Sequence, residues 1–294
     1  MTSLDPAAVA AHAFPERTAS WGPDDVILYH LAVGAGAGAA PFDLRYVYER
    51  DLVVLPSFGT LFAIAPILEL LRDPAVGVPL ERLLHGEHRI DVHRPLPVAA
   101  TITTSVRVEA IEDKDPHAVV ALVVESREVA DDRPLFTNRY RGFLRGAGGF
   151  GGTRRPRDRA AETGGRPEST VRLPTTPSQA LLYRLCGDKH PLHVDPAFAR
   201  AAGFDRPVLH GLCTFGLVCH GVVSSLLDGD ATRLRTMSAR FAEVVFPGET
   251  LELSCRRGTD AIRGVARCAE RGTDVLTDLA IDLRMEGQDA ERTA

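Results

Sequence analysis

The sequence has little that would tie it to a membrane, a nucleic acid or an export route. Its longest apolar runs stay below the roughly 18 residues that a membrane-spanning helix needs. Residues 1–13 lack the basic and apolar regions of a signal peptide. The net charge is only −5 and the pI about 6.1, which argues against nucleic acid as the main partner. We therefore expect a cytoplasmic protein with no membrane span and no nucleic-acid partner.

Cysteine is also scarce and poorly placed for a structural role. The chain has five cysteines, an odd number, and none of them forms a Cys-x-x-Cys pair. A disulfide framework or a zinc site is therefore not expected. The five, which are Cys186, Cys213, Cys219, Cys255 and Cys268, are therefore expected to be reduced. Cys186, Cys213 and Cys219 are most simply small core residues.

The remaining composition is that of an ordinary globular protein, with 45% hydrophobic and 25% charged residues in 294. This length suits one large domain or two of about 150 residues. A glycine cluster and a basic, proline-rich stretch interrupt the pattern between Arg145 and Ser178. We interpret residues 146–178 as a linker between a first unit, 1–145, and a second unit, 179–294.

The two flanks of this linker resemble each other. Tyr29 corresponds to Tyr183, Gly59 to Gly216, and Pro97 to Pro247, at offsets of 154, 157 and 150 residues. Each half reads as a short helix, a loop, a long buried helix and several strands, which predicts an α+β fold built as a tandem repeat. The predicted strands cover 84–92, 101–108, 118–129 and 136–144, and then 234–244, 250–255, 262–270 and 274–283.

The most informative segment is Leu185–Asp195, which places Asp188, His190, His193 and Asp195 within eight positions. A carboxylate and an imidazole held near each other can bind one water molecule and move its protons. Asp195 precedes a proline in the pattern of a helix N-cap, and we expect that role for it. The equivalent positions of the first half carry glycine and alanine, so we expect one active site per chain.

A second helix start follows the motif. His210 and Gly211 precede the apolar stretch Leu212–Leu227, which predicts a helix buried against a sheet. Backbone N–H groups at such a start are unsatisfied donors at the positive end of the helix dipole, so they suit a developing oxyanion. The Gly211 N–H is our candidate, whereas we expect the His210 side chain to be structural.

These residues carry a resemblance to a known family. The chain resembles the MaoC-like enoyl-CoA hydratase 2 family of (R)-specific hydratases, from about Asp25 to Leu283. The matching motifs are Tyr183–Asp188, Pro191–His193, Ala202–Asp205 and Leu209–Gly216 in the second half, and Tyr29, Val33–Gly36, Leu55–Gly59, Leu84–Glu87 and Gly148–Gly152 in the first. The resemblance implies a double hot-dog fold, in which each repeat wraps an antiparallel sheet around a central helix.

The resemblance also implies a reaction. Asp188 and His193 would add water across a trans-2-enoyl-CoA to give an (R)-3-hydroxyacyl-CoA, or remove it again. CoA would be part of the substrate, so no cofactor and no metal are expected. One position departs from the family pattern, because His190 stands where an asparagine is usual. His190 could replace that asparagine, transfer protons itself, or face solvent.

The first half, without ionisable groups at the equivalent positions, would shape the acyl pocket. Phe58, Leu61 and Phe62 are candidate lining residues, with core packing as the alternative for each. Arg154, Arg155 and Arg157 are expected to be solvated linker residues, with contacts to CoA phosphates as the alternative.

Three questions stay open at the level of sequence. The chain could bind acyl-CoA as a scaffold without catalysis, or His193 and Asp195 could belong to the iron site of a metal-dependent oxygenase. The acyl group could be carried by CoA or by an acyl carrier protein. A homodimer is compatible with the sequence, which does not fix the oligomeric state.

Overall fold

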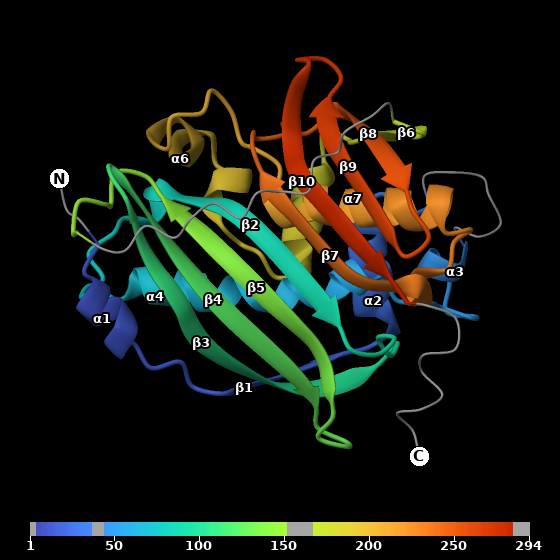
Figure 1. Ribbon diagram of the computed structural model, residues 1–294, viewed down its shortest axis with the longest axis horizontal. Helices are drawn as coiled ribbons and strands as arrows, with labels where there is room; N and C mark the ends of the chain where they lie inside the picture. Colours follow the sequence, from blue (N-terminus) through green and yellow to red (C-terminus); the bar gives the residue numbers. More distant parts are fainter. Residues whose placement is uncertain (1–3, 37–43, 152–166, 285–294) are drawn as a thin grey trace.

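The computed structural model describes residues 4–36, 44–151 and 167–284. Its strands form one ten-stranded sheet in the order β1-β3-β4-β5-β2-β7-β10-β9-β8-β6, with every neighbouring pair antiparallel. The sheet lies in front of the main helices in Figure 1. The strands are β1 (Arg17–Trp21), β2 (Leu83–Val92), β3 (Ala100–Lys114), β4 (His117–Glu128), β5 (Pro134–Leu144), β6 (Ser169–Pro174), β7 (Leu234–Phe241), β8 (Thr250–Arg257), β9 (Ala261–Cys268) and β10 (Thr273–Leu283).

The strand order repeats. Counted from each edge inward, the first half reads β1-β3-β4-β5-β2 and the second half reads β6-β8-β9-β10-β7. The two halves therefore share one topology and join at the centre through β2 and β7. This arrangement is the predicted double hot-dog architecture.

The helices connect the strands along the chain, and the main ones lie behind the sheet in Figure 1. The described α-helices are α1 (Pro6–Ala11), α2 (Pro23–Ala32), α3 (Leu44–Val47), α4 (Ile64–Arg72), α5 (Gln179–Tyr183), α6 (Pro196–Ala201) and α7 (Gly211–Leu226). The described 3-10 helices are η2 (Pro56–Ala63), η3 (Leu80–Arg82), η4 (Arg184–Cys186), η5 (Pro191–His193) and η6 (Ala231–Arg233). No helix in the described ranges is long and apolar enough to cross a membrane.

The two central helices differ in a way that the sequence did not predict. The second-half helix α7 is continuous and almost wholly buried, as expected. The first-half helix is not one α-helix, because it begins as η2 and becomes α4 only at Ile64. Pro66 explains the break: it has no N–H, and its ring would clash with the carbonyl of Phe62 in a continuous α-helix.

The sequence pattern did not predict two of the strands, β1 and β6. Both are short and form the outer edges of the sheet, where one side has no partner strand to favour apolar side chains. Strand β6 lies within the segment interpreted as a linker, where Ser169–Pro174 pair with Thr250–Cys255 of β8.

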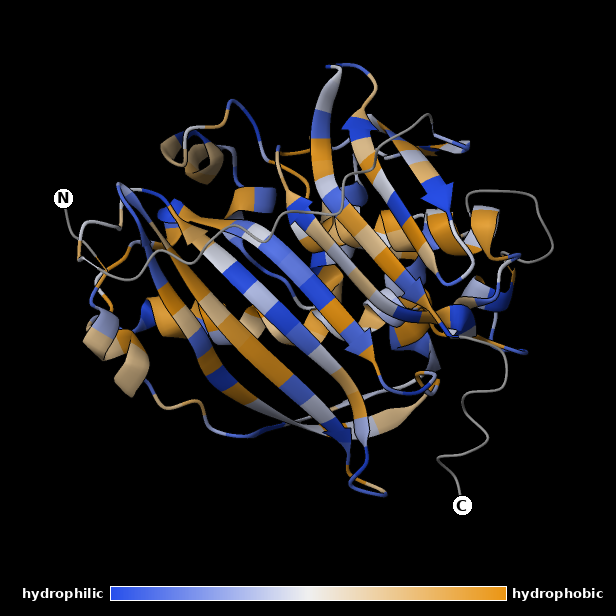
Figure 2. Cartoon of the chain, in the orientation of Figure 1, coloured by the Kyte–Doolittle hydropathy of each residue, from blue (hydrophilic) through white to orange (hydrophobic). Residues whose placement is uncertain are grey.

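The largest core is shared by the two halves. It joins side chains of α2, η2 and α7 to those of β2, β7 and β10. The two halves pack closely at Gly216 of α7, where an added Cβ would lie 2.6 Å from the Tyr29 hydroxyl and from Val33 of the first half. Tyr29 also lies near its repeat counterpart Tyr183, with ring centroids 6.1 Å apart. Figure 2 shows the matching alternation of hydrophobic and hydrophilic residues along strands such as β5 and β10.

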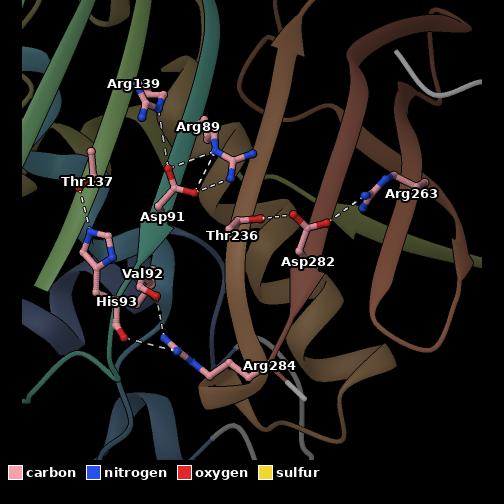
Figure 3. Close-up of polar contacts among 10 residues, drawn as sticks. All are labelled: Arg89, Asp91, Val92, His93, Thr137, Arg139, Thr236, Arg263, Asp282 and Arg284. Atoms are coloured by element: carbon pink, nitrogen blue, oxygen red, sulfur yellow. Dashed lines mark hydrogen bonds and ion pairs between the residues drawn. The ribbon is translucent and has the colours of Figure 1, made fainter. Parts of the chain in front are cut away.

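The outer face of the central seam is held by polar side chains (Figure 3). Arg89 binds Asp91 within β2, while Asp282 of β10 accepts hydrogen bonds from Thr236 and Arg263 at 2.8 and 2.9 Å. Arg284, just after β10, donates to the Val92 carbonyl of β2 at 2.7 Å and so bonds the second half to the first. Exposed ion pairs contribute little each, so the seam depends mainly on backbone pairing and the shared core.

Candidate active site

The loop from Gly187 to His193 places the acidic and basic groups of the site. Gly187 has φ 126°, a conformation that favours glycine, and it turns the chain after η4. The Asp188 carboxylate then accepts the His190 backbone N–H at 3.1 Å, which fixes its orientation. His193 ends the single 3-10 turn η5. The sequence motif thus folds as one compact local unit.

Asp188 and His193 meet a third residue, His210. Each of the three offers a side-chain ligand atom, and these atoms lie within 4.8 Å of one another. One water molecule that makes two hydrogen bonds of ordinary length spans about 4.5 Å between its partners. The spacing therefore suits a single water held between a carboxylate and an imidazole.

Hydrogen bonds determine which ring nitrogens are available. His193 Nδ1 lies 2.9 Å from the Val208 carbonyl, so this nitrogen carries the proton and donates. The Nε2 of a neutral His193 is then left as a base. His210 Nε2 lies 3.2 Å from the Asp188 carbonyl and donates in the same way. The two rings stack with centroids 3.7 Å apart and planes 29° apart.

Burial sets the charge state of these groups. It lowers the pKa of His193 to about 4, with the Val208 carbonyl acting weakly in the opposite direction. Burial also lowers the pKa of His210 well below its usual value. The pKa of Asp188 is raised by burial, against the hydrogen bond from the His190 backbone. At neutral pH the site therefore offers neutral imidazoles beside a carboxyl group that accepts a proton more readily than usual.

The same three residues have the composition of a metal site. His193 and His210 each hold one ring nitrogen against a backbone carbonyl, which leaves His193 Nε2 and His210 Nδ1 as the ring atoms available to a ligand. Metal analysis of the purified protein distinguishes a bound ion from a bound water.

Gly211 is the first residue of α7, and its N–H is among those that have no carbonyl partner inside the helix. A Cβ at this position would lie 3.1 Å from the Phe241 ring and 3.5 Å from the His85 Cβ. Glycine therefore allows the Phe241 ring to pack closely against the helix start. Gly211 also lines the cavity, where an oxygen of a bound molecule could approach its N–H.

A cavity of about 1630 Å³ is lined by Asp188, His190, His193 and Gly211. Strands β2 and β7 pair only from Glu87 and Arg240 to Asp91 and Thr236. Before Glu87 and beyond Arg240 the strands no longer pair, and residues 83–86 and 241–245 line the cavity. The cavity thus connects the buried Asp188 and the half-buried His193 with the outer face of the sheet, where Arg139 and Arg141 lie.

Two sequence-based alternatives are wrong. His190 does not face solvent, since it is buried and lines the cavity. Asp195 does not suit an oxygenase iron site with His193, because its carboxylate caps α6 by accepting the N–H groups of Ala197 and Phe198 at 2.7 and 3.3 Å. The N-cap expectation for Asp195 is confirmed.

The expected acyl-pocket residues need correction. Phe58 and Phe62 pack against Trp21, each with ring centroids 5.4 Å from it, and Leu61 packs against the same shared core. None of the three lines the cavity, whereas Ile64 and Leu68 of the following helix α4 do. The 3-10 start of this helix turns its first residues toward the core. Arg154, Arg155 and Arg157 lie outside the described residues.

Sequence reasoning underrated or missed several lining residues. The His210 ring stacks on His193 beneath the cavity wall, and His85, Tyr140 and Phe241 reach the cavity from three different strands. Only the Leu84–Glu87 motif gave any signal for His85. The others come together through the β2–β5 and β2–β7 pairings, which are distant in sequence.

Comparison with known proteins agrees with this geometry. A family model described as the MaoC like domain matches residues 158–277, and one described as the MFE-2 hydratase 2 N-terminal domain matches residues 20–146. Enoyl-CoA hydratase ChsH3 of Mycobacterium tuberculosis is 41% identical over 80% of this chain and 83% of its own length. The peroxisomal enoyl-CoA hydratase 2 of Arabidopsis thaliana is also 41% identical, over 82% of this chain and 83% of its own.

Solved structures show the same fold. The full-length peroxisomal multifunctional enzyme type 2 from Drosophila melanogaster aligns with a TM-score of 0.77 and 32% identity, over 92% of this chain and 48% of that one. A MaoC-like dehydratase from Phytophthora capsici aligns with a TM-score of 0.83 at 24% identity, over 96% and 99% of the two chains. With both halves matched in sequence and in structure, this chain belongs to the MaoC-like enoyl-CoA hydratase 2 family.

Proposed function

We propose that this protein is a hydro-lyase that adds water to a trans-2-enoyl-CoA to form an (R)-3-hydroxyacyl-CoA, and that catalyses the reverse dehydration. The observation that carries the proposal is the spacing of Asp188, His193 and His210, which suits one bound water at the buried end of the cavity. The names of the relatives, enoyl-CoA hydratase and 3-hydroxyacyl-thioester dehydratase, support the same reaction.

His193 acts as the base. Its Nδ1–H is committed to the Val208 carbonyl, so Nε2 is free to take a proton from the water. As that O–H bond breaks, the water oxygen bonds to Cβ of the enoyl group. The thioester carbonyl then carries the negative charge of an enolate. General base help of this kind is worth about 10²–10⁴-fold in rate.

The Gly211 N–H stabilises the enolate oxygen. It lies at the positive end of α7, and Gly211 lines the cavity. One such donor is worth about 10²–10³-fold. The negative charge forms only during the reaction, so this hydrogen bond strengthens in the transition state and lowers its energy.

The proton that His193 Nε2 took from the water is then delivered to Cα. Asp188 accepts a hydrogen bond from the water's second hydrogen, and its raised pKa suits it to carry a proton during the transfer. One water is consumed, its hydroxyl going to Cβ and its proton to Cα. Asp188 and His193 act on the same face of the enoyl group. Dehydration follows the same path in reverse.

His190 takes the place of the family's asparagine as a hydrogen-bond donor. The Leu192 backbone N–H donates to His190 Nδ1 at 3.2 Å, so the proton of the neutral ring is on Nε2. This Nε2 is buried and has no partner among the described residues, which leaves it free for the water. Replacement of His190 by asparagine should preserve turnover, and replacement by alanine should reduce it.

The second half, 179–294, supplies the catalytic groups in this proposal, and the first half, 1–145, shapes the acyl pocket. Ile64 and Leu68 of α4 are its lining residues, in place of Phe58, Leu61 and Phe62. No cofactor is needed, because the thioester itself activates Cβ. We also infer a cytoplasmic location from the composition. A homodimer is compatible with the sequence, and light scattering tests it.

Turnover of a chain-length series of trans-2-enoyl-CoA substrates, with chiral analysis of the product, tests this function. We expect hydration to the (R)-3-hydroxyacyl-CoA for at least one chain length. Tight binding of the series without any turnover would instead favour a non-catalytic acyl-CoA-binding role. The same series on acyl carrier protein tests the carrier.

A further inference from the structure

Arg145 occupies the same place in the first repeat that Arg284 occupies in the second. The two residues directly follow the last strands of their repeats, β5 and β10. Their backbone N–H groups donate to the last residues of the 3-10 helices η3 and η6, at 3.0 and 2.7 Å. Their guanidinium groups donate to the middle residues of the same helices, Glu81 and Thr232, each at 3.1 Å. The two arginines are therefore repeat counterparts.

The other contacts of the two guanidinium groups go to different places. Arg284 Nη2 donates to the carbonyl of Val92, the last residue of β2 in the central seam. Arg145 Nη2 donates to the Ala202 carbonyl at 2.6 Å, and Arg145 Cζ lies 5.8 Å from the centroid of the Phe204 ring, within the range of a cation–π contact. Arg145 thus ties the first repeat to the segment that follows α6 in the second.

The segment that Arg145 contacts packs as a small cluster of its own. Its buried members are Leu192, Ala199, Ala202 and Val208, and the partly buried residues that pack against them also belong to the second half. This cluster is separate from the core that the two halves share. In Figure 1, α6 lies apart from α7, beyond the beginning of β2. A side-chain tie from the first repeat therefore limits how far the cluster can move relative to the cavity.

The cluster also holds the proposed catalytic base. The Val208 N–H donates to the Leu192 carbonyl at 3.3 Å, and the Val208 carbonyl lies 2.9 Å from His193 Nδ1. A shift of the cluster would lengthen the hydrogen bond that keeps the His193 proton on Nδ1. It would also admit water to the half-buried His193 ring.

We propose that Arg145 is a positioning residue for the hydration reaction, which holds segment 202–208 in place so that the Val208 carbonyl keeps Nε2 of His193 available as the base. Arg145 touches no reacting atom in this account. The inference rests on the proposed function, since it takes His193 to be the base. It assigns to the first repeat a part in catalysis besides shaping the acyl pocket.

Arg145→Gln tests the inference. We expect kcat to fall by about 10–10²-fold, because a small misplacement of a catalytic group can cost that much, while KM changes less. The variant should also gain an acidic limb in its pH profile. With water admitted, the pKa of His193 should rise from about 4 toward the usual value of about 6.5, so kcat/KM should fall by up to about fourfold between pH 7.5 and 6.

Two further measurements separate positioning from general damage. The ionisable groups that face the His193 ring are Asp188, His190 and His210, and the substitution changes none of them. NMR titration of the His193 ring, which needs no turnover, should therefore show the same rise in pKa. Arg145→Lys keeps a donor but lacks the planar fork that reaches both carbonyls, so we expect an intermediate kcat and a weaker acidic limb. It also carries the test if Arg145→Gln does not fold.

Arg284→Gln is the matched control, because it removes the counterpart bonds to Thr232 and Val92, and Arg284 does not line the active-site cavity. It should keep the wild-type kcat and pH profile, whatever its effect on urea unfolding. Wild-type kcat and pH profile in folded Arg145 variants would overturn the inference, and so would the same losses in Arg284→Gln. Failure of the proposed function looks different: the wild type itself would hydrate no enoyl-CoA.

Discussion

At the scale of single residues, burial shifts the pKa values of Asp188 and His193 in opposite directions. Burial makes His193 a weak base that stays neutral and makes Asp188 a carboxyl group that holds a proton more readily. Such divergent environments are typical of groups that exchange protons during catalysis.

Removal of either group should abolish most of the activity. Asp188→Asn loses the carboxylate that orients the water, and His193→Ala loses the base. Each change should lower kcat by about 10²–10⁴-fold, while circular dichroism and thermal unfolding show an intact fold. Wild-type turnover by either folded variant is incompatible with the proposed roles.

The pH dependence should show the depressed pKa of His193. Its base form persists above a pKa of about 4, so kcat/KM should not fall as the pH decreases from 7.5 through 6.5. The decline should begin only at more acidic pH, where His193 is protonated and the raised pKa of Asp188 adds a second loss. The measurement is kcat/KM between pH 4.5 and 8. A limb near pH 6.5 that disappears in a His193 variant contradicts the assignment.

At the scale of elements, the start of α7 determines where the thioester can lie. Gly211→Ala would place a Cβ 3.1–3.3 Å from the Phe241 ring at the cavity wall, so this ring must shift toward the site proposed for the thioester. We expect a loss of about 10–10³-fold in kcat with little change in stability, because alanine is a better helix former than glycine.

The matched control is Gly22→Ala. Gly22 also stands at a helix start, that of α2, but an added Cβ has no neighbour within 4 Å. This variant should retain wild-type kcat. Equal effects of the two substitutions would show that the loss at Gly211 comes from helix capping rather than from the substrate site.

The elements also show what the sequence could predict. Helix α7 was predicted nearly to its ends, because its apolar residues and its His210-Gly211 start are local signals. The break in the first-half helix depends on Pro66, and the acyl-pocket residues were misplaced because that break rotates Phe58 and Phe62 into the core. The motif of Asp188 and His193 is local and could be read directly, whereas His85, Tyr140 and Phe241 meet only through long-range strand pairing.

At the scale of the whole molecule, two repeats with one topology share a sheet and a core, and the candidate site of Asp188 and His193 lies in the second repeat. Several buried histidines accompany this arrangement. Burial lowers the pKa of His30 to about 3 and that of His88, His190 and His193 to about 4.

These histidines should make the fold sensitive to acid. Below pH 6.5 these histidines bind protons in the unfolded chain but stay neutral in the folded chain. The free energy of unfolding therefore falls as the pH decreases toward 4. The raised pKa of Asp188 acts in the opposite direction, but it is one group against these four and against His85 and His210, whose pKa values burial also lowers. We expect a loss of several kcal/mol, on the order of 1.4 kcal/mol per pKa unit and group. Urea unfolding at pH 7.5 and pH 5 measures it; equal stability at both values would contradict the neutral buried state.

The most direct test of the central claim is the stereochemistry of hydration in D₂O. One water held by Asp188 and His193 supplies hydroxyl and proton from the same side of the enoyl group. NMR of the wild-type product should therefore show an (R)-3-hydroxyacyl thioester in which deuterium at Cα and hydroxyl at Cβ were added to the same face. Addition to opposite faces would contradict a single water bound between these two residues, and an (S) product would contradict the proposed (R) specificity.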